Sequence, residues 1–138
     1  MQSIQLPRQI VNKILAQAQA QEQQEICGLI SLNSDNALSI FPISNIAPEP
    51  SRFFEMDPSE TIQAMKKIRQ DNASLFAIYH SHPTTTAFPS KTDIEKIGYP
   101  DAIYLIVSLN TIGVLELKAY KIQQDTVTPI DLILDASN

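Results

Sequence analysis

Hydrophobic residues in the N-terminal part of the chain recur first at helical and then at strand spacing. The helical pattern follows Pro7 and is carried by five positions three or four apart: Ile10, Val11, Ile14, Leu15 and Ala18. This predicted helix ends in the glutamine-rich residues 21–24. The apolar runs 26–32 and 37–43 enclose Asn33-Ser34-Asp35-Asn36, a sequence typical of turns, and together they predict a β-hairpin.

The next segment is interrupted by prolines and then returns to helical spacing. Residues 44–52 contain two prolines and predict an exposed loop, and residues 53–56 predict a short strand. Asp57-Pro58 is a typical helix start, because aspartate caps free N–H groups and proline fits the first helical position. We expect this helix to run to about Asp71 and to bury three residues: Ile62, Met65 and Ile68.

The remaining sequence consists mostly of apolar runs of strand length. Residues 75–80 predict a buried strand, residues 83–89 an irregular loop and residues 90–98 a short helix. Three further strands are expected after it: 102–109, 114–122 and 127–134. Because strands and helices alternate irregularly, we expect a single α/β (α+β) domain over residues 1–138, with a mixed β-sheet flanked by helices rather than a regular parallel array.

Composition narrows the class of protein. A chain of 138 residues with 43% hydrophobic residues can bury a core of its own, and its formal net charge of −5 argues against nucleic acid or an anionic membrane as the main partner. Cys27 is the only cysteine, which excludes an internal disulfide and fits a reducing compartment. The sequence has no signal-peptide pattern and no membrane-length apolar run. We therefore expect a soluble cytoplasmic protein, and a homo-oligomer is compatible with this composition.

The two histidines of the chain, His80 and His82, stand two apart at the end of a predicted buried strand. Alternate residues of a strand point to one face, so both imidazoles can reach the same metal ion, and Asp93 could supply a third ligand. Two histidines and a carboxylate with one open position are typical of catalytic zinc, although iron, nickel or manganese also suit these ligand types. Spacing alone leaves open the alternative that both histidines are structural.

Three further residues near this pair each have two interpretations. Ser90 and Asp93 form the pattern of a capping box at a helix start, and such a helix could also turn Asp93 towards the histidines. Glu25 is a candidate base for a metal-activated water, or else a solvated carboxylate at a strand end. We expect Cys27 to be a small core residue rather than a ligand or nucleophile.

Taken together, these positions resemble the JAMM motif of the JAB1/MPN/Mov34 metallopeptidases. The resemblance rests on Glu25-Ile26-Cys27-Gly28-Leu29, on His80-Ser81-His82-Pro83, and on Ser90-x-x-Asp93, with seven residues between His82 and Ser90. Tyr99-Pro100-Asp101-Ala102 and the apolar strand after it are similar to compact bacterial members. The H-x-E with C-x-x-C signature of zinc deaminases and the H-E-x-x-H signature of other zinc proteases are missing.

The resemblance implies a role for each residue of the motif. The family fold is a mixed sheet with packed helices, similar to that of cytidine deaminases. His80, His82 and Asp93 would bind Zn²⁺ with water as fourth ligand. Glu25 would take a proton from that water and later protonate the leaving amine, and Ser90 would help to hold the oxyanion.

The resemblance also implies a substrate. Members of the family cleave peptide or isopeptide bonds after the C-terminal Gly-Gly of ubiquitin-like or sulfur-carrier proteins, and some release cysteine from such a carrier. The implied partner is the extended tail of the carrier, which could add as a strand near the site. Residues 45–56 either line that groove or form an ordinary connector. The alternative function is a non-catalytic scaffold or binding domain that retains the metal.

Overall fold

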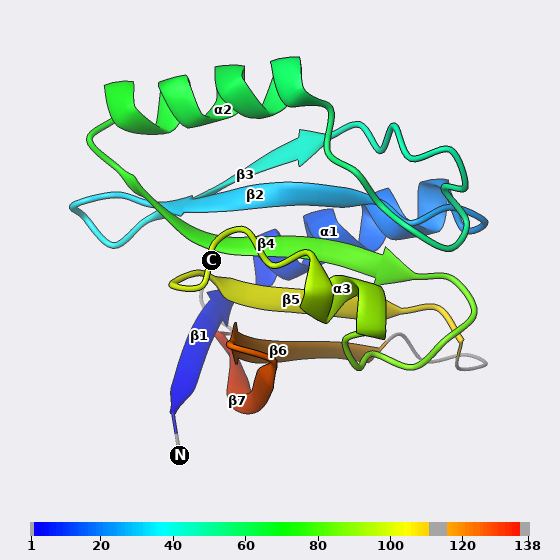
Figure 1. Cartoon of the computed structure of the whole chain (residues 1–138). Coiled ribbons are helices and arrows are strands. Elements are labelled where there is room, and N and C mark those ends of the chain that lie inside the picture. Colours follow the sequence, from blue (N-terminus) through cyan, green and yellow to red (C-terminus); the bar gives the residue numbers. More distant parts are fainter. Residues whose placement is uncertain (1, 111–115, 136–138) are drawn as a thin grey trace.

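The computed structural model describes residues 2–110 and 116–135, and within them ten elements build one sheet with helices on both faces (Figure 1). In chain order they are β1 Ser3–Pro7, α1 Arg8–Ala20, β2 Cys27–Leu32, β3 Leu38–Ile43, α2 Pro58–Gln70, β4 Ser74–His82, α3 Lys91–Glu95, β5 Ile103–Ser108, β6 Glu116–Gln123 and β7 Thr126–Asp135. The strand order is β1-β7-β6-β5-β4-β2-β3. The pairs β4–β5 and β1–β7 are parallel and the other neighbours are antiparallel, which confirms the predicted mixed sheet.

The two faces of the sheet carry separate cores, because successive strand residues point in opposite directions. In β4, Ala77 and Tyr79 join the core beneath α1, whereas Ile78 joins the core on the opposite face. Helix α1 lies behind the sheet in Figure 1, and α3 lies in front of β5. Ala64 and Ile68 bring α2 into the second core. The even-numbered residues at the end of β4 therefore point to the face that carries α2 and α3.

Local sequence signals placed the helix starts correctly. Helix α1 follows Pro7 and ends at Ala20, next to the glutamine-rich residues. Asp57 caps α2: its Oδ1 accepts hydrogen bonds from the N–H groups of Ser59 at 2.9 Å and Glu60 at 3.1 Å. Pro58 occupies the first helical position, as predicted. No helix in the described ranges is both long and apolar enough to cross a membrane.

The predicted buried face of α2 was partly wrong. Ile68 is buried, but Ile62 is 68% exposed, and Ala64 is buried in its place. Residues six apart lie about 120° from each other around a helix, so Ile62 and Ile68 cannot both face the sheet. The packed stripe follows Ala64 and Ile68, which are four apart.

Strand boundaries depended on pairing that the sequence did not show. Residues 53–56 form no strand; a single antiparallel bridge joins Asn45 to Met56. Strand β1 was not predicted, because its five residues, of which Leu6 alone is buried, become a strand only by pairing with β7. Strand β4 continues to His82, since its pairing with β5 extends to the pair His82 and Ser108. The strand predicted over 114–122 begins outside the described residues, and β6 starts at Glu116.

Candidate metal centre

His80 and His82 lie at the end of β4, between two neighbouring strands. His80 is still paired with Cys27 of β2, and His82 is paired with Ser108 of β5. Each histidine is 2% exposed, and their Nε2 atoms lie 3.1 Å apart. The strand therefore aims both imidazoles at one point, as their spacing predicted.

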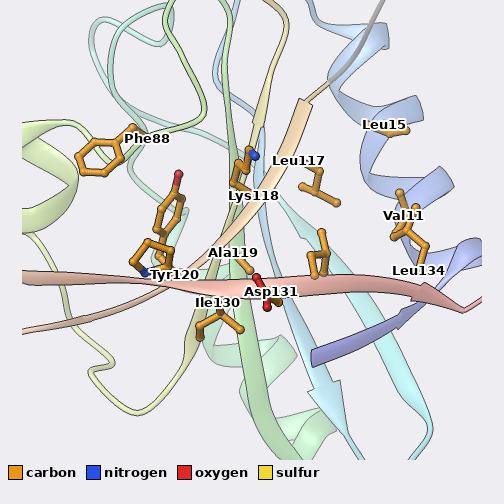
Figure 2. A pocket seen from close by; sticks show the side chains of 12 residues that line it. Val11, Leu15, Phe88, Leu117, Lys118, Ala119, Tyr120, Ile130, Asp131 and Leu134 are labelled. Carbon is orange, nitrogen blue, oxygen red and sulfur yellow. The ribbon is translucent and has the colours of Figure 1, made fainter. Parts of the chain in front are cut away.

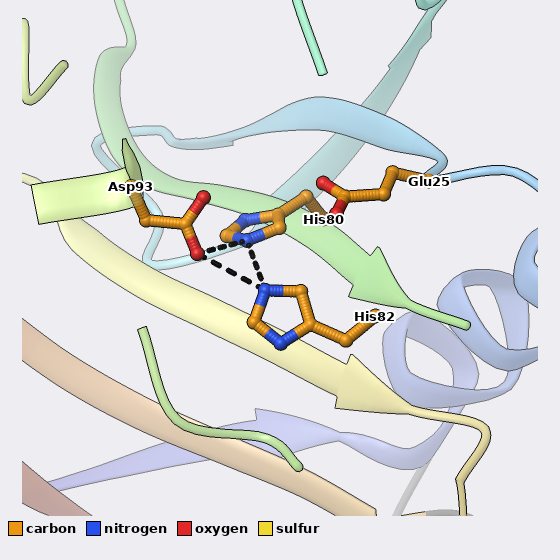
Figure 3. Close-up of side chains that lie close together, drawn as sticks. All are labelled: Glu25, His80, His82 and Asp93. Carbon is orange, nitrogen blue, oxygen red and sulfur yellow. Dashed lines mark hydrogen bonds and ion pairs between the residues drawn. The ribbon is translucent and has the colours of Figure 1, made fainter. Parts of the chain in front are cut away.

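Asp93 reaches the same point from the first turn of α3. The Ser90 Oγ accepts a hydrogen bond from the Asp93 N–H at 3.0 Å, and the Ser90 N–H donates to Asp93 Oδ2 at 2.9 Å, which completes a capping box. The same Oδ2 atom lies 3.1 Å from His80 Nε2 and 3.0 Å from His82 Nε2 (Figure 3). The two interpretations of this pair are therefore both correct, because the helix cap is what orients Asp93.

Glu25 is the fourth member of this cluster. Each of the four side chains offers one ligand atom, and these atoms lie within 4.8 Å of one another. Glu25 is 5% exposed, and its Oε1 is buried without a hydrogen-bond partner among the described residues. It is therefore not a solvated carboxylate. Burial raises the pKa of Glu25 from 4.5 to about 8; nearby His82 opposes this rise and Asp93 adds to it.

The other members of the cluster are electrostatically coupled. Burial lowers the pKa of His80. Burial alone would raise the pKa of Asp93, but hydrogen bonds from both histidines and from the Ser90 N–H hold it well below its usual range. Asp93 is therefore an anion beside imidazoles at neutral pH, and this combination of groups suits a divalent cation.

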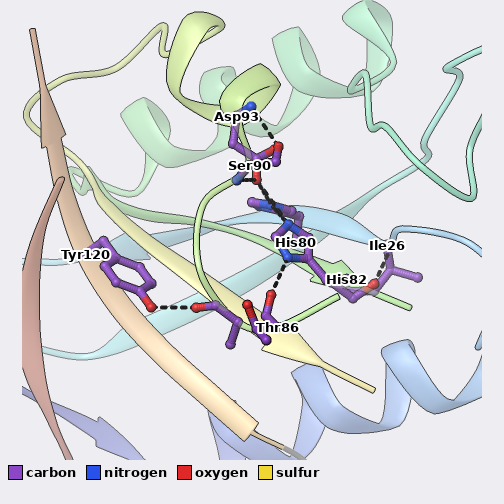
Figure 4. A network of polar contacts seen from close by, with 9 residues as sticks. Ile26, His80, His82, Thr86, Ser90, Asp93 and Tyr120 are labelled. Atoms are coloured by element: carbon purple, nitrogen blue, oxygen red, sulfur yellow. Dashed lines mark hydrogen bonds and ion pairs between the residues drawn. The ribbon is translucent and has the colours of Figure 1, made fainter. Parts of the chain in front are cut away.

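The two imidazole rings are held in different ways. The Nδ1 of His82 donates a hydrogen bond to the Thr86 carbonyl at 2.7 Å (Figure 4), so in the neutral, metal-binding form of the ring the lone pair lies on Nε2. His80 Nδ1 is buried and has no hydrogen-bond partner in the described ranges. Instead, the His80 ring stacks on Phe54, with centroids 4.4 Å apart and planes 23° from parallel. Thr86 and Phe54 were not singled out by sequence analysis, since neither residue type marks such a role.

The spacing of the three atoms fits a small metal ion. The two Nε2 atoms and Asp93 Oδ2 form a triangle with sides of 3.0 to 3.1 Å. Tetrahedral zinc with bonds of ~2.0–2.1 Å would place its ligand atoms roughly 3.3 Å apart. Two imidazoles and one carboxylate also leave one position of a tetrahedral ion open. The residues present therefore fit Zn²⁺.

A pocket of about 410 Å³ opens beside the cluster, and His80 and Asp93 form part of its wall. Its other walls are mostly apolar and come from the segment before α2, from α3 and from the sheet: Phe53, Phe54, Glu55, Met56, Thr92, Lys96, Ile97, Tyr104 and Ile122. Of the segment 45–56, residues 53–56 thus line a hollow next to the candidate metal centre. That this hollow is the groove for a substrate tail stays a prediction.

A larger hollow of about 710 Å³ lies between α1 and strands β6 and β7 (Figure 2). Val11 and Leu15 of α1 face Leu117, Ile130 and other residues of the two strands across it. None of the four clustered residues lines it. The clustered titratable side chains therefore identify the candidate site, whereas the size of a hollow does not.

Two buried residues near the cluster differ in what sequence analysis could say of them. Cys27 is buried, as predicted, and its thiol donates to the Ile43 carbonyl at 3.3 Å; burial raises the pKa of that thiol to about 12, so it is no nucleophile at neutral pH. Ser81, between the histidines, was missed as a contact residue. Its Oγ accepts from the Ile26 N–H at 2.8 Å, and its own N–H donates to the Ile26 carbonyl at 3.0 Å. Ser81 thereby ties the residue after Glu25 to β4.

Comparison with known proteins adds a family context. The chain matches the family described as prokaryotic homologs of the JAB domain over residues 7–123. It is 37% identical over 86 residues to a desampylase of Haloferax volcanii, covering 61% of this chain and 62% of that protein. It is 30% identical over 128 residues to the CysO-cysteine peptidase of Mycobacterium tuberculosis, covering 90% and 87%. A solution structure of a Desulfitobacterium hafniense protein superimposes with a TM-score of 0.84 at 30% identity, covering 96% of this chain and 93% of that one.

Proposed function

The chain belongs to the family of prokaryotic homologs of the JAB domain, and from this premise we propose that it is a zinc-dependent peptidase. Its substrate would be a ubiquitin-like or sulfur-carrier protein, cleaved after a C-terminal Gly-Gly. The observation that carries this proposal is the convergence of three metal-ligand atoms with the buried carboxylate of Glu25, whose Oε1 has no partner among the described residues. The names of the relatives, a desampylase and a peptidase that acts on a carrier–cysteine conjugate, support the substrate class.

In this proposal the metal is held by His80, His82 and Asp93. When bound, Zn²⁺ supplies Lewis acidity, which makes a water molecule more acidic and polarises a carbonyl. Asp93 contributes the one negative charge among these ligands, so the centre keeps a net formal charge of +1. The hydrogen bond that His82 Nδ1 donates to the Thr86 carbonyl keeps that ring in the tautomer that binds through Nε2.

Glu25 is proposed as the group that moves the proton. Its Oε1 is buried beside the metal-ligand atoms and has no partner among the described residues, so it is placed to accept a proton and to return it. It would accept a proton from the attacking water and give that proton to the nitrogen of the leaving amine, which balances the hydrolysis.

Ser90 is proposed as a hydrogen-bond donor to the oxyanion. Its Oγ already accepts from the Asp93 N–H, so the oxygen is fixed in place. Within the described ranges its hydroxyl proton makes no hydrogen bond, and the Ser90 side chain is exposed. A fixed donor of this kind stabilises charge that develops only in the transition state.

The burial of the two histidines supports a substrate whose C-terminal tail ends in glycine. His80 and His82 are each 2% exposed, so a peptide backbone must approach closely for its carbonyl to reach them. Residues without a Cβ allow such an approach. A Gly-Gly terminus fits this limit better than a terminus with bulky side chains.

The proposed function is tested with a carrier protein that ends in Gly-Gly and bears a C-terminal cysteine or an isopeptide-linked amine. The zinc-loaded protein should release the amine, as followed by mass spectrometry, and a chelator should stop the release until zinc is restored. A protein that binds one zinc per chain but cleaves neither adduct would overturn the proposal in favour of a scaffold. Cleavage that persists after complete metal removal would overturn the zinc mechanism.

A further inference from the structure

A single side chain on the segment between β3 and α2 contacts both sides of the candidate site. The Asn45 Nδ2 donates hydrogen bonds to the carbonyls of Glu25 and Phe53, each at 2.9 Å. The Asn45 Oδ1 accepts from the N–H groups of Ala47 and Glu55, each also at 2.9 Å. A carboxamide has two donor hydrogens and two acceptor lone pairs, and Asn45 uses all four.

The first group that Asn45 holds is the backbone of Glu25. Glu25 precedes β2, so it has no place in the hydrogen-bond ladder of the sheet. Its carbonyl is held by Asn45, and its N–H donates to the Pro50 carbonyl at 2.7 Å. The Oε1 of Glu25 has no hydrogen-bond partner among the described residues to position it, so the backbone contacts of Glu25 set the point from which its side chain reaches the cluster.

The second group that Asn45 holds is a wall of the pocket beside the metal centre. Asn45 bonds to Phe53 and Glu55, which flank Phe54, and all three residues line that pocket. Phe54 also stacks on His80, whose Nδ1 has no partner in the described ranges to fix the ring. The position of this wall therefore affects both the space for substrate and the support of a metal ligand.

We propose that Asn45 is a positioning residue that keeps Glu25 and the pocket wall 53–55 in one fixed relation, so that bound substrate and proton acceptor are aligned. This inference rests on the proposed function. Asn45 makes no hydrogen bond to the ligand atoms of His80, His82 or Asp93, so zinc is retained when Asn45 is replaced. Misplacement of a catalytic group by about 1 Å can cost on the order of 100-fold in rate.

The kinetic test compares Asn45→Ala with Asn33→Ala, both loaded with zinc. Asn33 is a matched control: it is half-buried like Asn45, and its Oδ1 accepts two backbone hydrogen bonds at 2.9 Å in the hairpin at the far end of β2. We expect Asn45→Ala to keep one zinc per chain, to lose roughly 10- to 100-fold in kcat and to raise KM. Asn33→Ala should change neither constant. Unchanged kcat and KM in folded Asn45→Ala overturn the proposal.

Amide hydrogen exchange tests the same contacts without any substrate. In Asn45→Ala the N–H groups of Ala47, Glu55 and Glu25 should exchange faster, whereas in Asn33→Ala those of Asp35 and Ala37 should do so. If the unsubstituted protein cleaves no Gly-Gly adduct, the proposed function fails, while this measurement still reports on the contacts of Asn45. Unchanged exchange of the Glu25 N–H in Asn45→Ala overturns the proposal that Asn45 holds the backbone of Glu25.

A second variant separates the two halves of the contact and serves if Asn45→Ala does not fold. Asn45→Asp keeps an oxygen for the N–H groups of Ala47 and Glu55 but loses the donors to the carbonyls of Glu25 and Phe53. The N–H groups of Ala47 and Glu55 should stay protected from hydrogen exchange, while kcat falls. Full activity in this variant would show that the bond to Glu25 has no positioning role.

Discussion

Replacement of Glu25 by glutamine should stabilise the metal-free protein at alkaline pH. Glu25 is 5% exposed, and burial raises its pKa from 4.5 to about 8. Between these values the folded protein holds a proton that the unfolded chain has released, so the free energy of unfolding falls as pH rises and levels off above about 8. At about 1.36 kcal/mol per pKa unit, the loss has an upper limit of roughly 5 kcal/mol. Glutamine carries no charge and avoids this loss.

The measurement is urea unfolding of chelator-treated Glu25→Gln and parent protein from about pH 5 to about pH 9. The difference in unfolding free energy between the two proteins should grow across this range in favour of the variant, because titrations that they share cancel. The exposed Glu22, replaced by glutamine, is the matched control and should follow the parent. With zinc restored, Glu25→Gln should bind the metal and lose roughly 10²- to 10⁴-fold in hydrolysis.

Two outcomes would refute this reasoning, each at a different step. A constant stability difference between Glu25→Gln and the parent over the whole pH range would show that burial does not hold the Glu25 carboxyl protonated. Retained hydrolysis in the zinc-loaded variant would remove Glu25 from the mechanism, whatever its pKa. If both expectations hold, the protein keeps a buried group that lowers its stability because that group is needed for proton transfer.

Three further predictions concern other positions. Asp93→Ala should reduce zinc content well below one per chain by elemental analysis, because it removes the oxygen that lies 3.0 to 3.1 Å from both histidine Nε2 atoms; unchanged content would break the ligand assignment. Ser90→Ala should lower kcat by roughly 100-fold with zinc retained and should cost ~1 kcal/mol of stability through the lost helix cap. An unchanged kcat would remove the hydroxyl from the reaction. Gly28→Ala should destabilise the fold by ~1–3 kcal/mol in thermal unfolding, since a Cβ there would overlap the Tyr79 ring, whereas Gly98→Ala, with open space around it, should have little effect.

The sequence predicted those parts of the fold that depend on neighbours in the chain. Capping by Asp57 and the start of α1 after Pro7 are local interactions, and both are observed where predicted. The pairing of β1 with β7 was missed, because it joins segments from opposite ends of the described chain. Ile62 was misplaced because apolar residues on a helix do not by themselves show which stripe will pack.

The candidate site was predictable for a similar reason. His80 and His82 share a face through the two-residue period of a strand, and the capping box turns Asp93 through the geometry of one helical turn. The contacts of Asn45 and Ser81 were not predictable. Asparagine and serine have many ordinary roles, and their partners here lie 20 and 55 residues away in the chain, at Glu25 and Ile26.

The sequence by itself therefore determined the ligand types, their local orientation and the resemblance to a family of metallopeptidases. Only the tertiary structure decided that the two histidines, Asp93 and Glu25 meet within 4.8 Å, and that Glu25 is buried without a partner for Oε1 in the described ranges. Helix caps and side-chain periods act over a few residues and can be read along the chain. Burial, and the pKa that follows from it, depends on every segment that excludes water from the site.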